Sequence, residues 1–218
     1  MAHPTDDKNF RLPTTLRPRR YQATVTLDLE GRTFTGEQRV ELELSQPTTE
    51  IILHANALEL GEVTLRTGND VRKPASKRVA PVSETVVLTF DAPLPAGSAT
   101  LDVLWTGHFS DGLRGLYAAG QVAATQFEAA DARRLFPCFD EPAFKARWAL
   151  TVRVPQGHAV LGNGRVVKDE KDGALRKVTF CKDCSPLEAT LTAPRRSLAA
   201  WLRFSDWPAP AMNEAAPP

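Results

Sequence analysis

The side chains best able to do chemistry lie close together in residues 125–145, where carboxylates, guanidinium groups, prolines and aromatic rings alternate. Gln126 and Glu128 are two residues apart, so in an extended chain both side chains leave one face and that of Phe127 leaves the other. A carboxylate held in this way can bind an ammonium group through a charge-assisted hydrogen bond. A solvated strand face would show the same pattern, and the pair alone favours that simpler interpretation.

A charged cluster follows this pair, and Pro137 and Pro142 interrupt it. Its members are Asp131, Arg133, Arg134, Asp140, Glu141 and Lys145. Proline fixes φ and removes an amide donor, so the chain must turn here, and charged side chains can cap the exposed backbone groups. We therefore expect a structural loop held by ion pairs. A glycosidase-like acid and base at Asp140 and Glu141 is disfavoured, because adjacent residues rarely face one site.

The elements around these residues are predicted to be β-strands, because apolar and polar residues alternate along the chain. Residues 21–29 and 34–44 each have one apolar face, and the turn at 30–32 predicts an antiparallel hairpin. Shorter apolar runs follow at 51–53, 63–65, 86–90, 101–105, 148–154 and 160–167. In the last run, residues 162–164 (Gly-Asn-Gly) are expected to make a tight turn through positive φ. The pattern predicts an all-β fold, an extended antiparallel β-sandwich.

The composition is that of a globular domain, since 218 residues of which 42% are hydrophobic can fill a core. The 27 basic and 26 acidic residues give a net charge of +1, so neither nucleic acid nor a membrane is an expected partner. No signal peptide and no run of about 20 apolar residues is found, which predicts a cytoplasmic protein. Three cysteines are too few for a disulfide framework and agree with a reducing compartment.

The dense segment resembles a family signature. Thr-Gln-Phe-Glu (125–128), Asp-Ala-Arg-Arg (131–134), Phe-Pro-Cys-Phe-Asp-Glu-Pro (136–142) and Phe-Lys-Ala (144–146) are similar to the N-terminal domain of the zinc aminopeptidases of the aminopeptidase N (gluzincin) family. Upstream segments at 10–13, 18–21, 34–36, 53–55 and 112–117 occur in the family's order. The resemblance covers about residues 10 to 180.

This resemblance implies a β-sandwich that lies against a catalytic domain and closes one side of its active site. It also implies that Glu128 binds the free α-amino group of a peptide and that Gln126 lines the pocket for its first side chain. A free amine, with a pKa of roughly 7.7 to 8.0, is largely a cation at neutral pH, whereas an internal peptide N–H is not. A buried Glu128 would therefore select peptide N-termini. The implied function is the substrate-capping domain of an enzyme that removes N-terminal residues.

The catalytic residues of such an enzyme are absent from the chain. The family's chemistry needs zinc on a His-Glu-x-x-His helix with a further glutamate. The four histidines, His3, His54, His108 and His158, are not paired at that spacing, and neither methionine lies in the family's Gly-x-Met-Glu-Asn strand. We expect no catalytic residue and no metal ligand here, no hydrolysis by this chain alone, and zinc only in the full-length enzyme.

Two other groups have simpler interpretations. Cys181 and Cys184 form a Cys-x-x-Cys pair, which can be half a zinc site or a redox couple. No second pair is present, so ordinary thiols are the expectation. His54 and His108 are expected to be structural, and Cys138 to be a small buried hydrophobe.

The chain is expected to have three parts: a disordered N-terminus at 1–9, the β-sandwich domain at 10–180, and an atypical Ala- and Pro-rich tail at 181–218. Our hypothesis is that the tail is a truncated or frameshifted end. A natural linker is the alternative, disordered except for one or two helical turns at 197–204. Two functional alternatives also stay open: a non-catalytic β-sandwich module that binds peptide N-termini or proteins, and a product without function.

Overall fold

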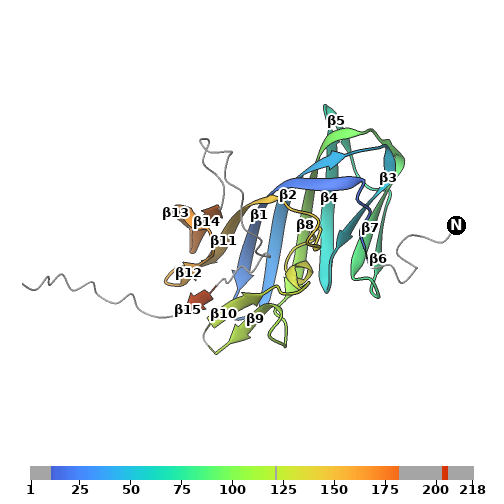
Figure 1. Ribbon diagram of the computed structural model, residues 1–218. Coiled ribbons are helices and arrows are strands. Elements are labelled where there is room, and N and C mark those ends of the chain that lie inside the picture. The colour runs from blue at the N-terminus through green and yellow to red at the C-terminus, as the bar shows by residue number, and fades with distance from the viewer. Residues whose placement is uncertain (1–10, 121, 182–202, 206–218) are drawn as a thin grey trace, which may run out of the picture.

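Strands form nearly all of the regular secondary structure in the protein, a computed structural model that describes residues 11–120, 122–181 and 203–205 (Figure 1). The predicted disordered stretch at 1–9 lies outside the described residues. The one helical element among them is the 3-10 turn η1 (Ala132–Arg134). None of the helical segments described has the length and apolar character needed to cross a membrane. The all-β fold class is thereby confirmed.

The strands form three sheets. The largest has eight strands in the order β13 (Arg165–Asp172), β14 (Leu175–Cys181), β11 (Arg147–Pro155), β1 (Leu16–Asp28), β2 (Thr33–Leu44), β8 (Gly97–His108), β4 (Leu58–Thr67) and β5 (Asp70–Arg72). A four-stranded sheet has the order β12 (Ala159–Leu161), β15 (Arg203–Ser205), β10 (Val122–Gln126) and β9 (Gly115–Ala119). A three-stranded sheet has the order β3 (Thr48–His54), β7 (Thr85–Leu94) and β6 (Ser76–Ala80).

The hairpin predicted from alternation is the centre of the large sheet. β1 and β2 pair in antiparallel fashion, with Tyr21 opposite Val40 and Val25 opposite Gly36, and their apolar faces are buried. On its other side β1 pairs with β11 in parallel, so the sheet is mixed where only antiparallel pairing was predicted. A parallel pair requires a long crossover. Here the whole three-stranded sheet, β9 and β10 of the four-stranded sheet, and the dense segment lie in that connection, between β2 and β11.

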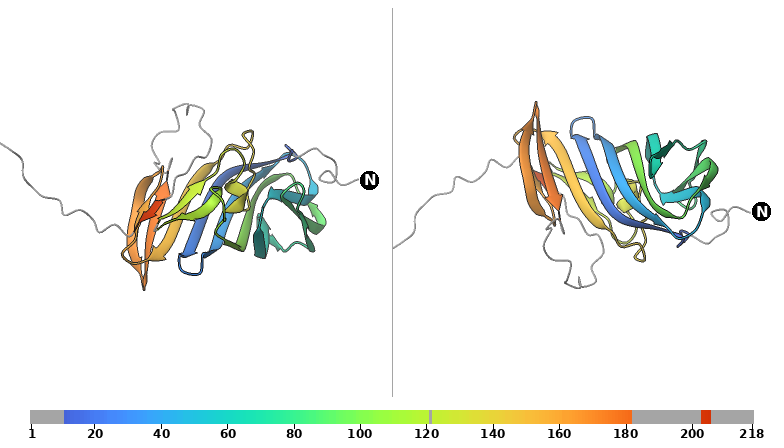
Figure 2. Two further views of the ribbon diagram at one scale, coloured as in Figure 1. Left: turned by 90° about the horizontal axis from the view of Figure 1, so that it is seen from below. Right: turned by 90° about the horizontal axis from the view of Figure 1, so that it is seen from above.

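One continuous core joins the three sheets. It contains side chains such as Val40 from the large sheet, Leu88 from the three-stranded sheet and Ala123 from the four-stranded sheet. The two small sheets lie over the large one, toward its opposite edges, as the views from below and from above show (Figure 2). The opposite face of the large sheet carries mostly polar side chains, because the buried positions of β1, β2 and β8 alternate with partly or fully exposed ones.

The turn predicted at residues 162–164 has a different form. Within the described residues, positive φ occurs at other glycines and not at Gly162 or Gly164. The segment carries the chain from β12 in one sheet to β13 in another. Glycine is needed for close approach: a Cβ on Gly162 would lie 3.0 Å from the Phe180 ring, and one on Gly164 would lie 3.3 Å from the Cys181 backbone.

Two expectations about the tail change. Arg203–Ser205 is the strand β15, paired with β10 and β12, so the helical turn expected there is wrong for Arg203 and Phe204. Cys181 is disulfide-bonded and not an ordinary thiol. Cys184 and the other tail residues lie outside the described residues.

Candidate functional site

The strand β10 presents the predicted binding pair at its end. Gln126 is its last residue and is half-buried, whereas Glu128 follows in a turn and is exposed. Phe127 between them is buried, with its ring 6.1 Å from that of Phe136 in an edge-on contact. The predicted alternation is therefore present, with the aromatic anchor inward. The shelter that selection of an amine requires is not supplied by the described residues, because Glu128 is exposed.

Glu128 lies in a closed turn. The Asp131 amide donates to the Phe127 carbonyl at 3.0 Å, and the peptide bond between Glu128 and Ala129 is cis. The chain then enters η1, where the Leu135 amide donates to the Ala132 carbonyl at 3.0 Å. The hydrogen bond between Asp131 and Phe127 therefore closes the turn that contains Glu128.

Arg133 connects η1 to two distant parts of the chain. Its side chain is 10% exposed; Nε donates to Asp140 Oδ2 at 3.0 Å, and Nη1 donates to Glu84 Oε2 at 3.1 Å. Burial raises the pKa of Asp140, and the hydrogen bond from Arg133 acts against that rise. A buried guanidinium needs such partners, because an unpaired charge away from water is costly. The predicted role of the cluster as a loop held by ion pairs is confirmed here.

His54, at the end of β3, fastens the loop to the three-stranded sheet. It exchanges two backbone hydrogen bonds with Cys138, at 2.8 and 3.0 Å, and its Nδ1 accepts from the Asp140 amide at 3.2 Å. Burial, with a smaller contribution from the Arg133 charge, lowers the pKa of His54 to about 3. The ring is therefore neutral at physiological pH, as its role as acceptor requires. The structural role expected for this histidine is confirmed.

The backbone of residues 135–139 makes three further hydrogen bonds with core side chains. Trp105 Nε1 donates to the Leu135 carbonyl at 2.8 Å, Gln38 Nε2 donates to the Pro137 carbonyl at 2.6 Å, and the Phe139 amide donates to the Tyr21 hydroxyl at 3.1 Å. The segment is thus fixed scaffold. Cys138 within it is a free, buried thiol whose pKa is raised by burial, as expected for a small hydrophobe.

Three residues of this site were not found from the sequence: Glu84, Asn56 and Gln38. Gln38 had a signal, since it is a polar residue on the apolar face of β2 and is 4% exposed. Glu84 and Asn56 lie in loops without a periodic pattern, so their hydrogen bonds with Arg133 could not be predicted from the sequence.

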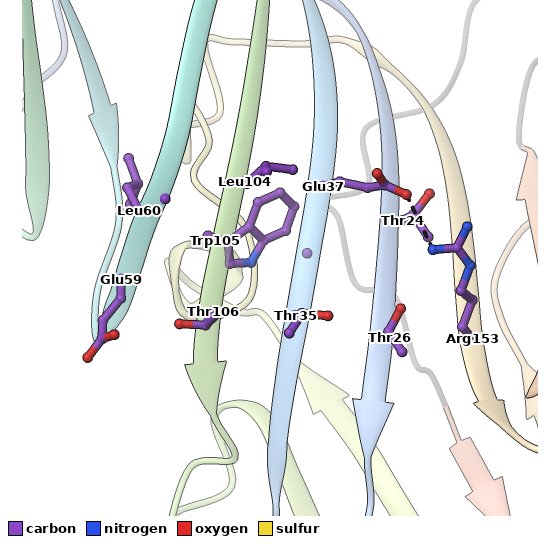
Figure 3. Close-up of a pocket in the computed structure, with 12 residues that line it drawn as sticks. Thr24, Thr26, Thr35, Glu37, Glu59, Leu60, Leu104, Trp105, Thr106 and Arg153 are labelled. Atoms are coloured by element: carbon purple, nitrogen blue, oxygen red, sulfur yellow. Dashed lines mark hydrogen bonds and ion pairs between the residues drawn. The ribbon is translucent and has the colours of Figure 1, made fainter.

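A hollow of about 520 Å³ lies elsewhere, on the polar face of the large sheet (Figure 3). Its lining includes four threonines, two leucines and an Arg153–Glu37 ion pair at 3.4 Å. Trp105 also borders the hollow, but its ring is buried on the core side of the sheet, where it covers Gly36. Neither Gln126 nor Glu128 borders it, and its lining contains no histidine or cysteine. We regard it as solvated sheet surface and not as a catalytic site.

No cluster of three or more His, Cys, Asp or Glu residues that could hold a metal occurs in the part of the chain that the structure describes.

The all-β fold of the chain agrees with the family comparison. The family described as "Peptidase M1 N-terminal domain" matches residues 17–185. The chain belongs to this family.

Several full-length aminopeptidases contain a similar segment. Aminopeptidase M1-A of Oryza sativa subsp. japonica is 36% identical over 182 residues, which cover 78% of this chain and 21% of that protein. Endoplasmic reticulum aminopeptidase 1 of Rattus norvegicus is 35% identical over 173 residues, covering 73% of this chain and 19% of the relative. Aminopeptidase M1 of Arabidopsis thaliana is 33% identical, with 83% and 22% covered. The chain spans about a fifth of the length of these relatives.

Proposed function

We propose that this chain supplies the substrate-capping wall of a zinc aminopeptidase. Glu128 binds the free α-amino group of a peptide, and Gln126 lines the pocket for its first side chain. The observation that carries this proposal is the end of β10, where Phe127 is buried and the residues on either side of it are not. The hydrogen-bonded loop behind them makes this wall rigid, as a site that orients a substrate must be.

The proposed partners are a peptide N-terminus and a catalytic domain. That domain would hold the zinc and the water that attacks the scissile carbonyl. It would also cover Glu128, which is exposed in this chain. Covering matters, because an ion pair in water contributes only about 0 to 1 kcal/mol, whereas a sheltered charge-assisted hydrogen bond contributes roughly 1.5 to 3 kcal/mol.

A titration with a matched pair of ligands tests the assignment. Leucinamide carries a free amine, and N-acetyl-leucinamide has the same side chain without the charge. We expect leucinamide, in about the 10 mM range, to shift the NMR signals of Gln126 and Glu128 in the 218-residue protein. The acetylated ligand should not. Glu128→Gln should abolish the difference between the two ligands.

Glu62→Gln is the matched control. Glu62 is also exposed, and it pairs with Lys73 at 2.8 Å on another part of the surface. This change removes the same charge without touching the wall and should leave the titration unchanged. Equal shifts with both ligands in the unmodified protein would show that Glu128 does not recognise an amine.

A further inference from the structure

Glu84 occupies a turn between β6 and β7 in a conformation that few side chains adopt. Its φ is +52°, in the left-handed region, where glycine and asparagine are accommodated more readily than glutamate. Non-glycine residues keep such a conformation when the surrounding structure determines it strongly.

Its carboxylate lies between three partners. Oε2 accepts from Arg133 Nη1 at 3.1 Å, and Oε1 lies 3.8 Å from Arg134 Nη2. Oε1 also accepts from the side-chain amide of Asn56. The Glu84 carbonyl in turn accepts from the Ala55 amide at 2.8 Å, which joins the turn to the end of β3. One carboxylate thus contacts two adjacent arginines, each of which also pairs with an aspartate.

Arg134 carries this contact to the candidate site. Its Nε donates to Asp131 Oδ1 at 2.7 Å, and the Asp131 amide closes the turn that contains Glu128. The Arg134 stem runs against β9 at Gly115, where an added Cβ would lie 2.6 Å from the Arg134 Cβ. The guanidinium is thereby directed by the backbone of β9 on one side and by two carboxylates on the other.

We propose that Glu84 is a positioning residue for Glu128. Its carboxylate holds Arg134, Arg134 holds Asp131, and Asp131 closes the turn from which the Glu128 side chain leaves the domain. Glu84 lies outside the sequence signature at 125–146, in the turn between β6 and β7 of the three-stranded sheet. A second part of the fold would therefore help to position the wall residue Glu128. Its consequence for peptide binding rests on the proposed function, but its effect on the turn does not.

Two variants separate the effect of the Glu84 carboxylate from that of the backbone conformation at this residue. Glu84→Gln keeps the size of the side chain and removes its charge. Glu84→Gly removes the side chain and suits the positive φ, so it should fold without backbone strain. In both variants we expect the amide hydrogen of Asp131 to exchange at least tenfold faster than in the unmodified protein. The Val40 amide in the centre of the large sheet should exchange at an unchanged rate, and so should both amides in the Glu62→Gln control.

The amine titration gives the second readout. The affinity for leucinamide should fall threefold or more in both Glu84 variants, and the Glu62→Gln control should match the unmodified protein. Unchanged exchange at Asp131 in both variants would overturn the positioning role. Faster exchange at Asp131 and Val40 alike would also overturn it, by showing a general effect on stability. If leucinamide and its acetyl derivative bind alike to the unmodified protein, the proposed function fails, and the exchange rates still decide the link between Glu84 and the turn.

Discussion

His54 shows how one residue can make a loop depend on pH. Its neutral Nδ1 accepts the Asp140 amide, and burial next to Arg133 lowers its pKa from about 6.5 to about 3. A base whose folded pKa is lowered adds stability above its unfolded pKa of about 6.5. That stability is lost as the pH falls from about 6.5 to 3, because the unfolded chain takes up the proton first.

We expect His54→Asn to weaken this acid sensitivity, since the asparagine carbonyl can accept the same amide and does not titrate. Between pH 7 and 4.5 the His54 contribution should amount to about 2 to 3 kcal/mol of unfolding free energy, at about 1.4 kcal/mol per pH unit. Urea unfolding at both pH values measures it. The variant should lose that much less stability on acidification.

Asp140 changes stability with pH in the opposite direction, and it does not affect the comparison between the unmodified protein and His54→Asn. Burial raises its pKa, so its contribution to stability is complete below its unfolded pKa and is lost as the pH rises through the folded value. It is present in both proteins and cancels in the difference. Equal acid sensitivity in the two proteins would show that His54 is not the titrating group.

The sequence predicted that Gln126 and Glu128 leave one face of the chain and Phe127 the other, because strand alternation is local. It did not indicate Glu84, which is 49 residues from its partner Arg133. Two charges so far apart in the chain leave no periodic signal, and the contact depends on how the three-stranded sheet folds against η1. It also expected a buried Glu128, whereas exposure depends on what covers the turn.

Among the elements, the hairpin of β1 and β2 was predictable from alternation, and the parallel pairing of β1 with β11 was not. The hairpin needs only a short turn, whereas the parallel pair depends on more than a hundred intervening residues. Residues 162–164 were assigned to a turn from their composition alone. Their contacts with Phe180 and Cys181 come from a strand that follows later in the chain.

The contact between β2 and β8 at Gly36 gives a prediction about packing. A Cβ on Gly36 would lie 2.1 Å from the Trp105 ring. Trp105 has little freedom to move, because its Nε1 bonds to the Leu135 carbonyl and its ring meets Phe136 edge-on. Gly36→Ala should therefore lower the unfolding free energy by about 2 to 3 kcal/mol, measured by urea unfolding.

Gly112→Ala is the control for this change. Nothing lies within 4 Å of a Cβ added at Gly112, and its φ is not in the left-handed region. We expect its effect to stay within about 0.5 kcal/mol. An equally small effect at Gly36 would mean that the sheet and the loop behind it can shift apart, and that Trp105 does not fix the scaffold.

At the scale of the whole molecule, the chain is one domain of a family whose full-length relatives are about five times longer. The described residues contain no metal cluster, and Glu128 lies on their surface. The function proposed above requires a second domain that covers Glu128 and holds the zinc. The sequence predicted the family and the fold class, because the signature at 125–146 is long and ordered. It did not predict that the three-stranded sheet and strands β9 and β10 lie in the connection between β2 and β11.

The most direct measurement of the proposed function is the activity of a chimaera. In it, residues 17–185 of this chain replace the matching part of the rice Aminopeptidase M1-A. We expect the chimaera to hydrolyse a leucine arylamide, and Glu128→Gln to lower its kcat/KM tenfold or more, equivalent to about 1.4 kcal/mol of transition-state binding. Glu62→Gln should leave kcat/KM unchanged. An active chimaera whose kcat/KM does not respond to Glu128→Gln would contradict the role of Glu128 as the amine-binding residue.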